Sequence, residues 1–368
     1  MKKIMKQHMS FFFSRKKILP TVGAIAVFLV FLAIAPSILG AFELRIFNLC
    51  GIYVVLALSM NLINGFTGQF SLGHAGFMAV GAYVSALLTM SPATKSAVYY
   101  LKPIVPFLAT VQVPFTVALV MAGLVTALVA ALIGAPVLRL KDDYLAIATL
   151  GFSEIIRVVF TNLQSITNGS LGLKNIPRYT TIWWAWGTAL FVIAFMVLLI
   201  KGSYGRAFKA IRDDEIAAEA MGVNLFSHKL AAFMIGAFFA GVGGALMGNQ
   251  LGAIDPNMYK ISLTYNILLI VVLGGIGSIT GSVISAMAVT ILMELLRPLD
   301  ESMNVFGLFI IPGIPGMRMV VFSAILMSII LFYQRGIMGN KEFSWEAVAR
   351  TYTAIRNKMR TLGRRKAQ

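Results

Sequence analysis

Charged residues are scarce in this sequence, acidic ones above all, and so are histidine and cysteine. Of its 368 residues, 12% are charged and 58% are hydrophobic, with 14 acidic side chains, three histidines and one cysteine. Soluble domains carry about 25% charged residues, so a soluble globular fold is excluded. The single cysteine, Cys50, rules out a disulfide within the chain, and we expect it to pack in the apolar run where it lies.

The sequence instead contains long apolar runs. Runs of roughly 20 residues, the length that crosses a bilayer core as a helix, recur along the whole chain. They predict an all-α, polytopic helical membrane protein with about ten transmembrane segments, some of them short or broken. The predicted segments are residues 18–40, 44–63, 70–90, 111–138, 144–163, 182–200, 230–250, 263–273, 281–296 and 319–333.

The basic residues gather outside these runs, in three stretches that an even number of crossings places on one side. The positive-inside rule makes that side cytoplasmic. We therefore expect a basic cytoplasmic N-terminus (1–17), a transmembrane domain (18–334) with a cytoplasmic loop (201–229), and a basic cytoplasmic tail (335–368) that can touch anionic lipid. No folded basic domain accompanies the net charge of +17, so nucleic acid is not an expected partner.

The loop 201–229 is the longest charged segment between two predicted spans. Apolar residues at helical spacing predict one amphipathic helix over residues 206–221, which Gly222 then ends. Such a helix lies in water, where it is either a plain solvated connection or a docking element. Charges of both signs, available for docking, come from Arg212, Asp213, Asp214 and Glu215.

A glycine-rich stretch over residues 61–88 is predicted to interrupt a membrane helix, because Gly65, Gly68, Gly73 and Gly76 recur within it. Non-helical backbone at membrane depth survives only where protein or a water-filled cavity satisfies it, and polar broken helices mark substrate paths. The alternative is that the glycines allow close helix packing and the histidine bonds a backbone carbonyl. The candidate path residues are Asn64, Thr67, Gln69, Ser71 and His74.

Two further patterns are predicted to be structural. Gly244, Gly248 and Gly252 form a ridge that lets helices approach closely. Two charge pairs, Glu154 with Arg157 and Glu294 with Arg297, stand three residues apart and are expected to stabilise or anchor their helices.

Enzymatic chemistry is not expected of this chain. The phosphate-binding pattern G-x-x-x-x-G-K-[ST] does not occur in the sequence. No nucleophile–base constellation and no cluster of metal ligands can be assigned, so we expect no catalytic residue, no metal and no cofactor.

Four segments together resemble one family. AIRDDEIAAEAMGVN (210–224) is similar to the cytoplasmic loop of ABC importer permeases. NLINGFTGQFSLGHAGFMAVGAYVSALL (61–88), LRLKDDYLAIATLGFSEIIRVV (138–159) and VVLGGIGSITGSVISA (271–286) resemble segments of branched-chain amino acid permeases of the LivM type. The resemblance runs from about residue 44 to residue 333.

The resemblance implies a transport subunit of a prokaryotic cell membrane. Its partners would be two ABC ATPase subunits that use the ATP, a second homologous permease and an extracytoplasmic solute-binding protein. The loop would form the helix that couples to the ATPase and would contribute Arg212, Asp213, Asp214, Glu215, Glu219, Ala220 and Gly222.

Two alternatives stay open. Within the family, the cargo could instead be urea, a short amide or a related amino compound. From a different class, a self-sufficient secondary transporter or channel would move solute alone and without ATP. With His74 the one histidine in a predicted span, a proton relay has little support.

Overall fold

The structure is a computed structural model that describes residues 15–140, 142–300, 303–305, 309–311, 316–332, 336–339 and 342. It divides into two compact units, Met1–Leu44 with Lys341–Gln368 and Arg45–Asn340, and each is described by itself. Most of the basic termini predicted at residues 1–17 and 335–368 lies outside the described residues.

Within the described residues, six helices are long and apolar enough to cross a membrane. Each contains an apolar run of the length that a bilayer core requires. They are α3 (Ala41–Met60), which continues as the π-helix η1 (Asn61–Phe66), α7 (Phe115–Val137), α8 (Asp142–Asn162), α10 (Ile182–Lys201), α13 (Leu225–Leu251) and α15 (Ile279–Leu295), which the 3-10 turn η4 (Arg297–Leu299) follows.

The remaining predicted spans correspond to shorter apolar helices. α4 (His74–Thr89) meets α5 (Pro92–Val98) at a bend of 119°, and this pair can count as one broken span. The others are α2 (Arg15–Ile38), α14 (Ile261–Gly274) and α16 (Met317–Phe332). Each predicted segment thus coincides with a helix, and the prediction of a polytopic helical membrane protein is confirmed.

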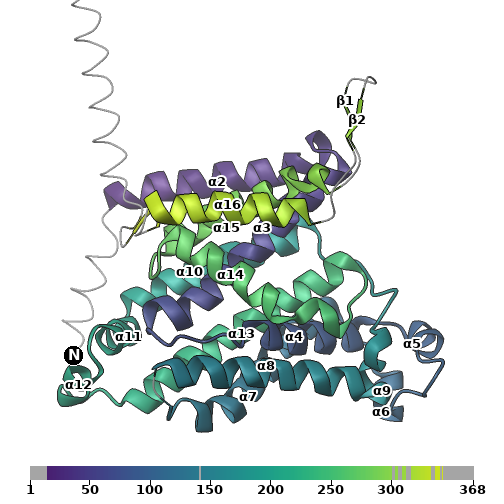
Figure 1. Ribbon diagram of the computed structural model, residues 1–368, viewed down its shortest axis with the longest axis horizontal. Helices are drawn as coiled ribbons and strands as arrows, with labels where there is room; N and C mark the ends of the chain where they lie inside the picture. The colour runs from purple at the N-terminus through teal and green to yellow at the C-terminus, as the bar shows by residue number, and fades with distance from the viewer. Residues whose placement is uncertain are drawn as a thin grey trace, which may run out of the picture. The chain divides into compact units, whose positions relative to one another are not determined.

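Short elements lie at two opposite ends of the larger unit (Figure 1). The α5–α9 end holds α5, α6 (Pro106–Thr110), α9 (Gln164–Thr167), η2 (Gly169–Leu171) and η3 (Pro256–Tyr259). The α11–α12 end holds α11 (Ser203–Asp213) and α12 (Glu215–Ala220). A small antiparallel hairpin of β1 (Met303–Val305) and β2 (Phe309–Ile311) precedes α16.

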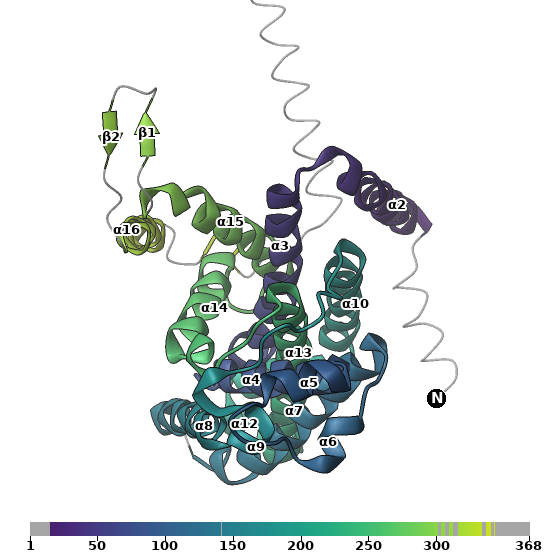
Figure 2. The same ribbon diagram turned by 90° about the vertical axis from the view of Figure 1, so that its right-hand side faces the viewer.

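Helices α4, α7 and α13 pack side by side, with α8 against α4 (Figures 1 and 2). Their backbones approach closely because glycine stands at the contacts. A methyl group on Gly81 would lie 2.1 Å from the carbonyl oxygen of Gly241, and one on Gly244 would lie 2.1 Å from that of Met78. Gly244 of the predicted glycine ridge therefore does lie at a close helix contact. Gly252 of the same ridge instead ends α13 at φ +77°.

This packing predicts opposite effects for two glycine-to-alanine changes. Alanine is ordinarily favoured over glycine inside a helix by about 1 kcal/mol. Gly244→Ala should nevertheless lower the unfolding temperature by a few degrees, because the methyl group forces α13 and α4 apart. In the control, Gly187→Ala on α10, the methyl group meets no atom within 4 Å and should leave or raise that temperature. Thermal unfolding in detergent measures both, and equal destabilisation would contradict the packing role of Gly244.

Candidate functional site

The chain leaves helical geometry between η1 and α4, over residues 67–73. The π-helical turns of η1 are wider than α-helical ones, and Gly68 follows them at φ +73°, where glycine is favoured. This break contacts α11, so it is a connection at the α11–α12 end and not an interruption midway along a span. Two glycines used in the prediction are helical, Gly65 in η1 and Gly76 in α4.

The five candidate path residues all lie in or beside this break. Four of them are buried and Asn64 is half-buried. Each has a hydrogen-bond partner within the protein, so together they hold the break in shape, and their place on a path stays a prediction. The bonds are Asn64 Nδ2 to the Ser71 carbonyl (3.2 Å), Thr67 Oγ1 to the Leu62 carbonyl (2.9 Å), Gln69 Nε2 to the Lys229 carbonyl (3.0 Å) and His74 Nε2 with Ser59 Oγ (2.9 Å).

Asn61 joins this break to the second glycine-rich one, which precedes α15. Its Nδ2 donates to the carbonyl of Ser278 at 2.9 Å and to Ser282 Oγ at 2.8 Å, and its Oδ1 accepts from the amide of Gly277 at 2.8 Å. The side chain is fully buried. Asn61 was not predicted as a functional residue, because its partners stand more than 200 residues away in the sequence. The available signal was an asparagine inside an apolar run.

The connection 201–229 forms two helices, not the single helix predicted over residues 206–221. The division falls at Asp214, whose backbone is extended and whose Oδ1 accepts from the amides of Ile216 (2.9 Å) and Ala217 (3.0 Å). Aspartate favours this capping position over a helix interior, which explains the correction. Gly222 ends the second helix at φ +84°, as predicted.

Contacts tie this connection to the break. Arg212 pairs with Asp213 at 2.8 Å, and its Nη1 lies 3.4 Å from the carbonyl oxygen of Gly65 in η1. Lys229 pairs with Glu215 at 2.5 Å, and its backbone carbonyl accepts from Gln69. The connection is therefore linked to η1 through Arg212 of α11 and to the break through Lys229 at the start of α13.

The outermost part of the connection is exposed and partly apolar. Ile216 is 82% exposed and Met221 is 84% exposed, although both are large hydrophobic residues in water-facing segments. Glu219, Ala220 and Gly222 are exposed beside them, while Phe208, Ile211 and Ala218 are buried beneath. Exposed apolar side chains beside charged ones are typical of a docking surface. The charged residues of this surface were among the predicted ones, whereas Ile216 and Met221 were not predicted from the sequence.

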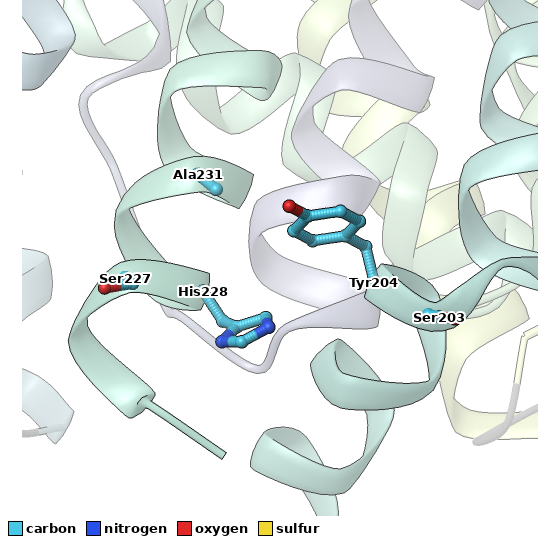
Figure 3. Close-up of a pocket in the computed structure, with 5 residues that line it drawn as sticks. All are labelled: Ser203, Tyr204, Ser227, His228 and Ala231. Carbon is cyan, nitrogen blue, oxygen red and sulfur yellow. The ribbon is translucent and has the colours of Figure 1, made fainter.

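A pocket of about 300 Å³ lies where α11 and α13 begin. Figure 3 shows Tyr204 and His228 extending into the space between the two helices. Their rings are 5.7 Å apart, and His228 Nδ1 lies 2.8 Å from the carbonyl oxygen of Asn224. The pocket thus opens beside the exposed connection, at the α11–α12 end. The residues that line it are Ser203, Tyr204, Ser227, His228 and Ala231.

Membrane-length helices, with an exposed connection that bonds to a break between two spans, define a multi-pass membrane protein. The chain belongs to the family of branched-chain amino acid transport system permease components, which matches residues 43–331. This match covers nearly all the described helices and confirms the resemblance found in the sequence.

Individual relatives agree with the family. The permease protein LivM of the high-affinity branched-chain amino acid transport system of Salmonella typhimurium is 34% identical over 291 residues, which cover 70% of this chain and 64% of the relative. Escherichia coli LivM is 33% identical over 317 residues, covering 76% and 70%. Escherichia coli LivH of the same kind of system is 25% identical over 309 residues, covering 79% and 92%. No solved structure matches the chain.

The junction at Asn61 predicts a large loss of stability when its amide is removed. Asn61→Ala deletes three hydrogen bonds and leaves buried partners unsatisfied, so the free energy of unfolding should fall by about 2–4 kcal/mol. The matched control is Asn162→Ala, which removes an exposed bond to the carbonyl of Val158 and should change stability by less than about 0.5 kcal/mol. Denaturant unfolding of both variants measures the difference, and similar values would contradict the junction.

Proposed function

We propose that this chain is the membrane-spanning permease subunit of an ATP-driven importer of branched-chain or closely related amino acids. The observation that carries the proposal is the family match over residues 43–331, nearly the whole transmembrane part. The LivM and LivH relatives belong, by their names, to branched-chain amino acid transport systems.

We further propose its partners and its orientation. The α11–α12 end would face the cytoplasm, because the basic residues of 201–229 gather there. Two ATPase subunits would bind at this end and use the ATP, a second permease chain would lie alongside, and an extracytoplasmic solute-binding protein would deliver cargo at the α5–α9 end. Both termini would be cytoplasmic.

The proposed mechanism is alternating access driven through the exposed connection. The ATPase would contact Ile216 and Met221, whose large apolar side chains stand in water. Movement there would reach the break through Arg212, which contacts Gly65, and through Lys229, which joins Glu215 to Gln69. A partner shifts such an equilibrium only through contacts that differ between the two states, and these linkages are where the difference would be felt.

ATP hydrolysis would reside in the partner subunits. The sequence has no G-x-x-x-x-G-K-[ST] loop to cradle phosphates. Among the described residues, no three histidine, cysteine, aspartate or glutamate side chains gather as a metal site would require. This chain would supply the path and its gating.

The function is tested by reconstituting the four-subunit assembly in liposomes with the solute-binding protein. Leucine uptake should require ATP and all partners, and uptake by this chain alone would instead make it a self-sufficient transporter.

Met221→Asp should weaken copurification of the ATPase, because it charges the apolar docking surface. Met258→Asp, an exposed methionine in η3 at the opposite end, should leave copurification unchanged.

Arg212 should matter for transmission more than for assembly. Arg212→Gln removes the guanidinium that contacts Gly65, so uptake per ATP hydrolysed should fall severalfold while ATP hydrolysis continues. Arg206→Gln is the matched control, since Arg206 lies on the same helix and bonds to Ser203 rather than to the break. Parallel assays of uptake and hydrolysis measure the ratio, and an unchanged ratio in Arg212→Gln would refute the linkage.

A further inference from the structure

Exposed basic side chains stand at the α5–α9 end, which the proposed orientation places outside the cell membrane. The positive-inside rule explains basic residues on the cytoplasmic side and gives no reason for them here. They lie in three short segments, residues 91–113, 164–181 and 252–260. The same segments contain one acidic residue, Asp255, whose Oδ1 accepts from the amide of Asn257 at 2.7 Å. The exposed basic residues are Lys102, Lys174, Arg178 and Lys260.

These four side chains have no acidic partner in the part of the chain that the structure describes. The ion pairs there are made by other residues, and most of them lie in the spans or in the connection 201–229. An exposed lysine or arginine without an internal partner can pair with a carboxylate of another molecule without breaking a bond within the protein. The excess of positive charge at this end is therefore available to a binding partner.

Hydrogen bonds join the three segments into one layer across the ends of the spans. The backbones of Leu173 and Ile254 bond to each other in both directions, at 2.8 and 2.9 Å, and the amide of Val105 donates to the carbonyl of Ser165 at 3.2 Å. Figure 2, which looks at this end of the larger unit, shows α5, α6 and α9 in front of the longer helices. The layer therefore faces the solution beyond the spans and not the hydrocarbon at their sides.

Buried polar side chains fix the shape of this layer. Lys95 is fully buried, and its Nζ donates to the carbonyl of Leu108 at 2.8 Å. The hydroxyl of Tyr99, which is also buried, donates to the carbonyl of Ile166. A surface that is already ordered loses little conformational entropy when a partner binds to it.

Aromatic side chains are exposed beside the basic ones. Tyr100 is 71% exposed and stands two residues before Lys102, and Tyr179 is 42% exposed and follows Arg178 directly. Tyrosine and arginine are enriched at protein–protein interfaces, where an aromatic ring supplies apolar contact next to paired charges. Lipid headgroups would favour the same residues at the sides of the spans, whereas these lie in the layer across the ends of the spans.

We propose that this basic layer is the docking surface for an acidic face of the solute-binding protein. Its four lysine and arginine side chains pair with carboxylates of that face, and the two tyrosine rings pack against the apolar part of the contact. Complementary charge speeds the encounter and orients the loaded protein over the ends of the spans. The inference rests on the proposed function, which supplies this partner and the orientation, and it adds the chemistry of the contact.

The test measures the Kd of the purified, leucine-loaded solute-binding protein for the complete assembly in nanodiscs. Lys174→Glu with Arg178→Glu should raise the Kd at least tenfold, because like charges then face each other. Raising NaCl from about 50 mM to about 500 mM should weaken binding to the unaltered assembly and have less effect on the variant. The matched control, Arg139→Glu with Arg206→Glu, makes the same change of net charge at exposed residues of the opposite end and should leave the Kd unchanged.

A second variant asks whether the surface extends over all three segments. Lys102→Glu with Lys260→Glu changes the two segments that the first variant leaves intact, and it should also raise the Kd severalfold or more. Because all four side chains are exposed, both variants should unfold at the temperature of the unaltered chain. A higher Kd at an unchanged unfolding temperature reports the surface itself and not a loss of folding.

Each result decides the proposal. An unchanged Kd in both charge-reversal variants would overturn it. Reduced retention of phosphatidylglycerol with an unchanged Kd would assign the surface to lipid and would overturn it as well. Failure of the proposed function is distinguishable, because the unaltered assembly would then bind no solute-binding protein at any salt concentration, and the docking surface would fall with it.

Discussion

The hydrogen bonds of the Asn61 side chain are the interaction on which the rest of the α11–α12 end depends. It occupies a position that glycine surrounds on both sides: a methyl group on Gly65 would lie 2.6 Å from the amide nitrogen of Gly277. Two stretches that are more than 200 residues apart in the chain, η1 and the turn before α15, are thereby fixed to each other. Because the junction is buried, leaving the amide unpaired would be costly, and this cost holds the two segments together.

That junction lies beside the exposed connection 201–229. α11 lies against η1, and Arg212 approaches both Gly65 and Gly277, so one guanidinium stands over the point where the two breaks meet. The exposed surface around Ile216 and Met221 lies in and just after α12, which directly follows the end of α11 where Arg212 stands. The proposed ATPase partner would thus act on backbone that is not locked into α-helical hydrogen bonds, where rearrangement costs least.

The sequence predicted the helices well and their contacts poorly, for physical reasons. Apolar runs of membrane length identify spans because the bilayer thickness fixes their length. The division of the connection at Asp214 depends on two hydrogen bonds to one carboxylate oxygen, which periodicity does not reveal. Periodicity also does not reveal that α4 starts at His74 rather than at residue 70. Asn61, Ile216 and Met221 were missed because their roles depend on partners or exposure, neither of which is local. The charged residues Arg212 and Glu215 were found because charge between spans is conspicuous.

The π-helical form of η1 makes the chain sensitive to its own length at this point. A π-helical stretch holds an additional residue within an otherwise α-helical ladder. Loss of one residue from Asn61–Phe66 would let ordinary α-helical bonds close over the gap. The wider turns of η1 set the spacing at which the Asn61 amide and the Gly65 backbone both meet the turn at Gly277. A change of chain length within Asn61–Phe66 would alter that spacing, so the length of η1 is as much a part of this junction as any side chain.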